Sequence, residues 1–95
     1  MTAEQRTALI AEIRADNQVP PYTPDQVIGR SVDKCEARLD ALKPGADFAA
    51  DKLGRGYLKD AVMYDMVHRF EEFLQNYGPD IRAWQLSEEV ADASE

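Results

Sequence analysis

The chain has 95 residues, of which 18 are acidic and 11 basic, giving a net charge of −7. This length suits one domain with a single modest core, and the acidic excess without a basic cluster argues against nonspecific nucleic-acid binding. One cysteine rules out an internal disulfide framework and no apolar run is long enough to span a bilayer, so we expect an intracellular protein without a membrane partner.

A first helix is predicted over residues 3–15. Thr2 can cap it, and Gln5 at the third helical position would complete a capping box. The N-terminal stretch lacks a basic region followed by an apolar block, so it is not a signal peptide. Residues 16–22 are predicted to be a proline-rich loop. The helix should pack on one side only, through Leu9, Ile10 and Ile13.

A second helix is predicted from Thr23, as its cap, and Pro24, in the favoured first position, to about Lys43. The Pro44-Gly45 pair should end it. Cys35 falls within its apolar seam, where a cysteine acts as a small hydrophobe rather than a nucleophile. The seam is narrow enough for one or two partner helices and comprises Ile28, Val32, Cys35, Leu39 and Leu42.

The stretch ADFAADKLGRG, residues 46–56, has a short and mixed pattern. We expect one helical turn here, anchored by Phe48 and Leu53, and a loop or hinge at Gly54 and Gly56. The Gly-Arg-Gly sequence is too short for a phosphate loop, so a turn is the favoured interpretation.

A third helix is predicted over residues 57–77, stopped by Gly78-Pro79, and a short last helix over residues 80–86. Residues 87–95 should be an acidic, flexible tail. Because no segment alternates like a strand, we expect an all-α fold. Residues 1–86 should form a small bundle of three main helices with a short terminal helix.

The predicted third helix has an apolar face that covers half of its circumference, nearly twice what one neighbouring layer requires. Either a second protein chain covers the excess, or the short segments around Phe48 and Ile81 do, and both interpretations stay open. Aromatic residues and arginine are enriched at interface centres. The candidate interface residues are Met63, Met66, Val67, Phe70, Phe73, Leu74, Tyr77, Ile81, Arg82, Trp84 and Leu86.

His68, with Asp65 and Glu72 at helical spacing, could ligate a metal from one helix face. No second histidine or thiolate accompanies it, so ordinary surface pairs are the favoured interpretation. We expect no catalytic residue, no metal and no cofactor.

The order of these parts resembles the head–tail connector (adaptor, or head-completion) proteins of tailed bacteriophages. The resemblance covers roughly residues 5–86 and begins with the leading helix and the proline-rich loop. TPDQVIGRSVDKCEARLDAL follows, with the pattern Glu36-Ala37-Arg38-Leu39, and then YLKDAVMYDMVHRFEEFLQNY, with Leu58-Lys59 near its start. The aromatic close FEEFLQNYGPDIRAWQL completes it.

This resemblance implies a homo-oligomeric ring, commonly of about twelve copies, that contacts a portal protein on one side and a tail or stopper protein on the other. DNA would pass through its channel without specific binding, helped by the acidic balance. The protein would then lie at the head–tail junction of the virion, and in the host cytoplasm during assembly.

A second interpretation is a small acidic inhibitor or anti-defence protein, acting by protein binding or by imitating nucleic-acid charge. Such mimics concentrate carboxylates on one face. Here the acids interleave with lysines and arginines, and only the last nine residues are purely acidic. This pattern favours the connector and leaves the inhibitor as the alternative.

Overall fold

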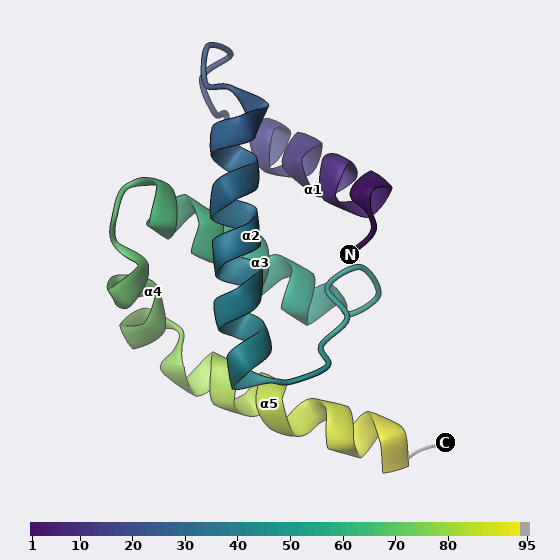
Figure 1. The fold of residues 1–95 in the computed structure, drawn as a ribbon. Helices are drawn as coiled ribbons and strands as arrows, with labels where there is room; N and C mark the ends of the chain where they lie inside the picture. Colours follow the sequence, from purple (N-terminus) through teal and green to yellow (C-terminus); the bar gives the residue numbers. More distant parts are fainter. Residues whose placement is uncertain (94–95) are drawn as a thin grey trace.

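The computed structural model describes the backbone of residues 1–93 and the side chains of residues 1–87. Within that part the chain forms helices and no strands, so the predicted all-α fold is confirmed. In Figure 1, α2 stands at the centre, α1 lies on one side of it, α3 crosses behind it and α5 follows the lower edge. The helices are α1 (Ala3–Asp16), α2 (Asp25–Leu42), α3 (Lys52–Met66), α4 (Phe70–Asn76) and α5 (Gly78–Ala93).

The predicted capping box of α1 is confirmed. The Gln5 backbone N–H donates to the Thr2 hydroxyl at 3.1 Å, and the Thr2 backbone nitrogen donates to the Gln5 side-chain oxygen at 2.8 Å. These bonds satisfy backbone donors that the first turn of a helix leaves unpaired. The predicted apolar stripe is buried as expected, at Leu9, Ile10 and Ile13.

The second helix begins one residue later than its predicted first position. Pro24 is the N-cap residue, in an extended conformation, and no side chain caps the helix, so the prediction that Thr23 caps it is wrong. Arg14 of α1 holds this corner instead, donating to the Thr23 carbonyl at 2.7 Å and to the Asp25 carboxylate at 2.6 Å. The seam is confirmed at its first four positions, which are fully buried, whereas Leu42 at its end is exposed.

The start of α3 differs from its prediction because Asp51 caps it. The Asp51 carboxylate accepts the Leu53 N–H at 3.1 Å, so the helix begins at Lys52 rather than Tyr57. Gly54 and Gly56 therefore lie inside the helix, and the predicted hinge there is wrong. Phe48 is buried as predicted, but Leu53 is 55% exposed and does not anchor the core.

The predicted third helix is broken in the middle. His68 adopts a left-handed backbone conformation (φ 61°), which ends α3 at Met66 and allows α4 to begin at Phe70. The Arg69 N–H donates to the Tyr64 carbonyl at 2.8 Å and closes the turn. The prediction of one continuous helix over residues 57–77 is therefore wrong. The predicted position of apolar residues around that helix fails beyond Met66, because the residues after the turn no longer follow the axis of α3.

The last helix is longer than predicted, since α5 spans Gly78–Ala93 rather than residues 80–86. It therefore includes most of the segment 87–95 that we expect to be a flexible tail. The side chains of residues 88–95 and the backbone of residues 94–95 lie outside the described part of the chain, so flexibility of the tail stays a prediction.

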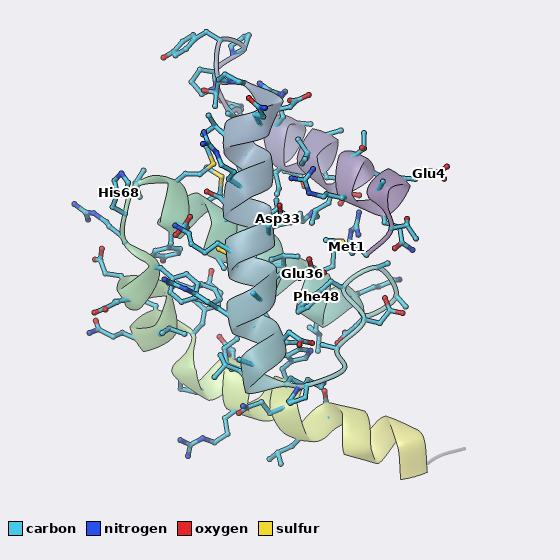
Figure 2. All side chains as sticks on the ribbon, viewed as in Figure 1. Met1, Glu4, Asp33, Glu36, Phe48 and His68 are labelled. Atoms are coloured by element: carbon cyan, nitrogen blue, oxygen red, sulfur yellow. The ribbon has the colours of Figure 1, made fainter. Side chains whose placement is uncertain are left out.

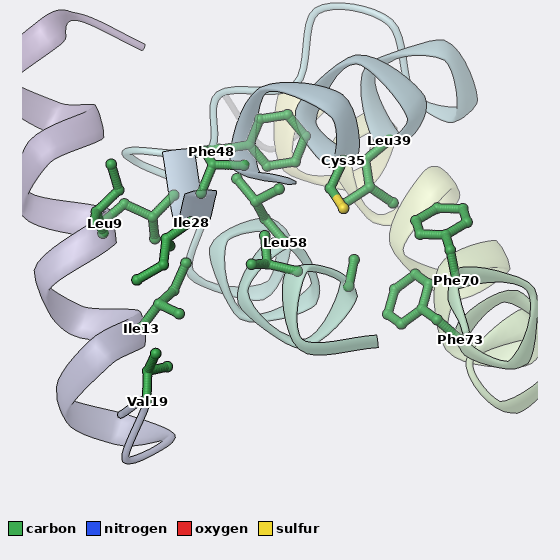
Figure 3. Close-up of a cluster of buried hydrophobic side chains, with 14 of the residues drawn as sticks. Leu9, Ile13, Val19, Ile28, Cys35, Leu39, Phe48, Leu58, Phe70 and Phe73 are labelled. Carbon is green, nitrogen blue, oxygen red and sulfur yellow. The ribbon is translucent and has the colours of Figure 1, made fainter. Parts of the chain in front are cut away.

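One apolar core joins the helices. Figure 3 shows α1 contributing Leu9 and Ile13 from one side, α2 and α3 meeting through Ile28, Cys35 and Leu58, and α4 closing the far side with Phe70 and Phe73. The turn that breaks the third helix makes this closure possible, because it brings α4 back against α3.

Candidate protein-docking surfaces

The residues considered for metal binding do not converge on an ion site. Asp65 is buried and accepts the Ser31 hydroxyl at 2.9 Å and pairs with Lys34 at 3.1 Å, so its carboxylate joins α2 to α3. Figure 2 shows His68 at the edge of the molecule, on the turn between α3 and α4. Within the described part of the chain, no group of three or more metal-ligating side chains could hold an ion.

Cys35 lies in the interior between α2 and α3. Desolvation and, to a lesser extent, the nearby Asp65 carboxylate raise the pKa of its thiol to about 12, against the opposing effects of Arg38 and Lys34. The thiolate is the nucleophilic form of cysteine, so this side chain is inert at neutral pH. Its position supports a packing role.

The candidate interface residues are distributed between the core and the surface. Phe70, Phe73, Ile81 and Trp84 are buried within the monomer. Met63, Met66 and Tyr77 are half-buried and pack against this core. The exposed members are Val67, Leu74, Arg82 and Leu86.

Buried and half-buried aromatic residues form a continuous row from the segment before α3 to α4. Trp84 lies 6.0 Å from Phe48 and 5.7 Å from Tyr57, measured between ring centroids. Tyr77 continues the row and stacks on Phe73 at 4.6 Å. The apolar half predicted for the third helix is thus covered largely from within the monomer, because its second part is α4 and faces the same core.

One exposed apolar surface, which we call the turn surface, surrounds Val67 at the end of α3. Val67 is 59% exposed. Beside it is a shallow groove of about 310 Å³, with the Met63 and Tyr64 side chains from α3 and a polar edge of Arg69, Glu72 and Asn76. Such an apolar site with a polar rim is typical of protein contacts.

A second exposed apolar surface, the helix-start surface, comprises Leu42, Leu53 and Leu86, which are 38, 55 and 59% exposed. Leu42 is the last residue of α2, Leu53 is the second residue of α3, and Leu86 lies on α5. Gln85 donates to the Leu42 carbonyl at 2.6 Å, and Trp84 donates to Asp51 at 2.7 Å. The sequence does not predict Leu42 and Leu53 at this surface, because their spacing places both in the core.

The two surfaces lie at opposite ends of α3. Leu53 is the second residue of this helix and Val67 directly follows its last residue. At about 1.5 Å per residue they are separated by about 20 Å along the helix axis. Figure 1 shows the two ends of α3 on opposite flanks of the molecule.

Charged side chains fix α1 to α2 and α3. Glu12 accepts from Arg55 at 3.1 Å and from Lys59 at 3.4 Å. The hydrogen bond from Arg55 lowers the pKa of Glu12 against the opposing effect of burial, and the same bond raises the pKa of Arg55. On the other side, Arg6 binds both carboxylate oxygens of Asp33, at 2.8 and 3.1 Å. In Figure 2, Asp33 and Glu36 lie on the side of α2 that faces α1.

A groove of about 670 Å³ runs between α1 and the start of α2. Its apolar lining comes from Ile10, Ala11 and Ala15, and Arg6 and Arg14 also line it. Both arginines already bind carboxylates of α2. The groove therefore presents little uncompensated positive charge to a ligand.

Comparison with known proteins finds no matching family model, no matching curated protein and no matching solved structure. Among the described residues, no helix combines the length and the apolar character needed to cross a membrane.

Proposed function

We propose that this chain is a structural head–tail connector (adaptor) subunit of a tailed phage or a related particle, which forms a ring between portal and tail. The observation that carries the proposal is the pair of exposed apolar surfaces at opposite ends of α3. A ring needs a head-to-tail contact, in which each copy offers one surface to the next copy and a different surface to the previous one.

The structure changes the reason for expecting a ring. The predicted half-cylinder of apolar residues is not a surface, because α4 folds back and buries Phe70 and Phe73 within the monomer. Support for the ring now comes from Val67 at one end of α3 and Leu53 at the other. The portal and the tail or stopper protein remain the proposed partners, with DNA in the channel.

The charge distribution favours the connector over a nucleic-acid mimic. Carboxylates on the described surface alternate with bases that bind them, as in the pairs of Asp33 with Arg6 and Asp16 with Lys59. A mimic needs an uninterrupted acidic face, whereas a channel subunit needs only a net negative balance, and the chain carries −7.

The experiment is native mass measurement of the purified chain, alone and with a portal protein. The wild-type chain should assemble into a closed ring in at least one of these conditions. Val67→Asp and Leu53→Asp should each abolish the ring while the monomer stays folded, because both side chains are more than half exposed. Tyr22→Ser is the matched control, since Tyr22 is 85% exposed and lies on neither surface.

Mixing the two variants tests the head-to-tail geometry. A Val67→Asp copy retains its helix-start surface and a Leu53→Asp copy retains its turn surface, so one contact can still form between them. The mixture should give heterodimers that cannot close into a ring. A wild-type chain that stays monomeric with and without the portal would overturn the proposal, as would normal rings from both variants.

A further inference from the structure

The attachment of α5 to the rest of the molecule is concentrated at two side chains. Within residues 78–87, Ile81 and Trp84 are the buried ones, at 6% and 1% exposure. The Trp84 ring packs against Phe48 and Tyr57, and the ammonium group of Lys43 lies 4.8 Å from its centroid. The neighbours of Trp84 in sequence are half-buried or exposed.

The hydrogen bonds of α5 join it to both ends of the segment 43–51, which connects α2 to α3. Lys43 Nζ donates to the Trp84 carbonyl at 2.6 Å, and Gln85 Nε2 donates to the Leu42 carbonyl at 2.6 Å. At the other end of the segment, Trp84 Nε1 donates to Asp51 Oδ2 at 2.7 Å. Docked α5 therefore holds both ends of the connection in place.

The Asp51 carboxylate has two roles. Its Oδ1 accepts the Leu53 N–H at 3.1 Å and caps α3, while its Oδ2 accepts the Trp84 indole N–H. The Arg55 N–H also donates to the Asp51 carbonyl at 2.8 Å. Release of Trp84 would remove a partner that orients the capping carboxylate, so the start of α3 depends on α5.

A boundary for this dependence lies at Gly78. Tyr77 is held on the α4 side, because its hydroxyl donates to Asp60 at 3.0 Å and its ring stacks on Phe73. Ile81, four residues later, belongs to the attachment of α5. Gly78 is the first residue of α5 and directly follows the last residue held on the α4 side, so it marks the junction between the two parts.

We propose that α5, the segment 43–51 and the first turn of α3 form one latch, closed by Trp84, which opens as a unit about Gly78 while α1, α2 and the rest of α3 stay folded. Opening releases the 16-residue α5 and uncovers Phe48 together with the Lys43 ammonium. The latch does not depend on ring formation and makes α5 available to a partner without global unfolding.

The test is native-state hydrogen exchange on the full chain. In the wild type at rising denaturant, the amides of Ile81 and Trp84 should share one opening free energy with those of Leu53 and Arg55, below that of Cys35 in α2. Lys43→Met should speed exchange of all four latch amides by about tenfold or more and leave the Cys35 amide unchanged. Lys52→Met, at an exposed lysine in the first turn of α3, is the control and should change none of them.

Two results would overturn the latch. Faster exchange in α5 with unchanged Leu53 and Arg55 amides would show that the start of α3 is independent. An equal increase at every amide, Cys35 included, would show only a loss of global stability. The wild-type denaturant series decides the question by itself if Lys43→Met does not fold, and Trp84, as the single tryptophan, gives a fluorescence readout of the same opening.

Discussion

Gly54 and Gly56 are two residues apart in α3, yet their surroundings differ. A Cβ at Gly54 would lie 3.1 Å from both the Asp51 carboxylate and the Trp84 ring. A Cβ at Gly56 would meet nothing within 4 Å. Glycine allows the first contact to be close, whereas at the second position it only weakens the helix.

Alanine should therefore have opposite effects at these positions. Gly56→Ala is expected to stabilise the protein by about 0.5–1 kcal/mol, since alanine is the better helix former. Gly54→Ala should destabilise it by about 1–2 kcal/mol, because Trp84 must move outward and the crowding outweighs the gain in helix propensity. Urea unfolding followed by circular dichroism measures both. Stabilisation by Gly54→Ala would contradict the close contact with Trp84.

Cys35 should be protected in the folded state. At pH 8 a thiol reagent should modify it far more slowly in the native protein than in urea, because the thiol is buried and its pKa is raised to about 12. Because the folded pKa is raised, Cys35 contributes fully to the free energy of unfolding at pH values below its ordinary pKa of 9.0. This contribution is lost as pH rises from 9 towards 12. In Cys35→Ala the loss of stability over this range should be smaller. Rapid native modification would place the thiol at the surface.

At the scale of helices, the turn at His68 decides how α3 and α4 pack. A left-handed conformation costs an L-residue about 1–2 kcal/mol, and glycine avoids that cost. His68→Gly should therefore leave stability unchanged or raise it by up to about 1 kcal/mol. In a continuous helix the same substitution would lower it by about 1 kcal/mol, so the sign of the change in urea unfolding distinguishes the two structures.

Gln75→Gly is the matched control for His68→Gly. Gln75 is exposed on α4 and has ordinary helical surroundings, so glycine there should cost up to about 1 kcal/mol. Equal losses from both substitutions would favour one uninterrupted helix over the observed turn.

The sequence was most informative where local chemistry fixes a helix end. The Thr2 and Gln5 capping box and the buried first part of the α2 seam followed directly from residue type and spacing. The break at His68 did not, because neither glycine nor proline marks it and the apolar spacing continues through it. Packing of α4 against α3 favours the turn, and a single-helix projection cannot represent that contact.

The sequence also predicts some residues of the turn surface and the helix-start surface, but not all of them. Val67 and Leu86 are predicted interface residues and are exposed. Phe73 and Trp84 are also predicted interface residues, but the core of the monomer buries them. The prediction that Leu53 anchors the core overlooks Asp51 as the cap of α3. Aspartate just before a helix is the usual sequence sign of such a cap.

At the scale of the whole molecule, carboxylates with lowered pKa values make stability depend on acid. Glu12 is lowered from 4.5, chiefly by its bond from Arg55. At Asp51 burial is the largest effect and raises the pKa, but the bonds from Trp84 and from two backbone amides outweigh it and give a value below 3.8. Groups of this kind stabilise the fold above their unfolded pKa values.

Stability should therefore fall as pH decreases below about 4.5 and continue to fall as these groups are protonated at their lowered folded values. The urea midpoint measured between pH 7 and pH 3 checks this. Glu12→Gln should reduce the slope, because it removes one of the groups that titrates. Equal slopes in the wild type and in Glu12→Gln would contradict the assignment to Glu12.

The Asp65 carboxylate, held between the Ser31 hydroxyl and the Lys34 ammonium, has a mechanical consequence. Sliding α3 along α2 by one turn, about 5.4 Å, would strand that buried charge without its partners. The two helices are therefore pinned in register. A displacement of α3 along its axis would therefore carry α2 with it.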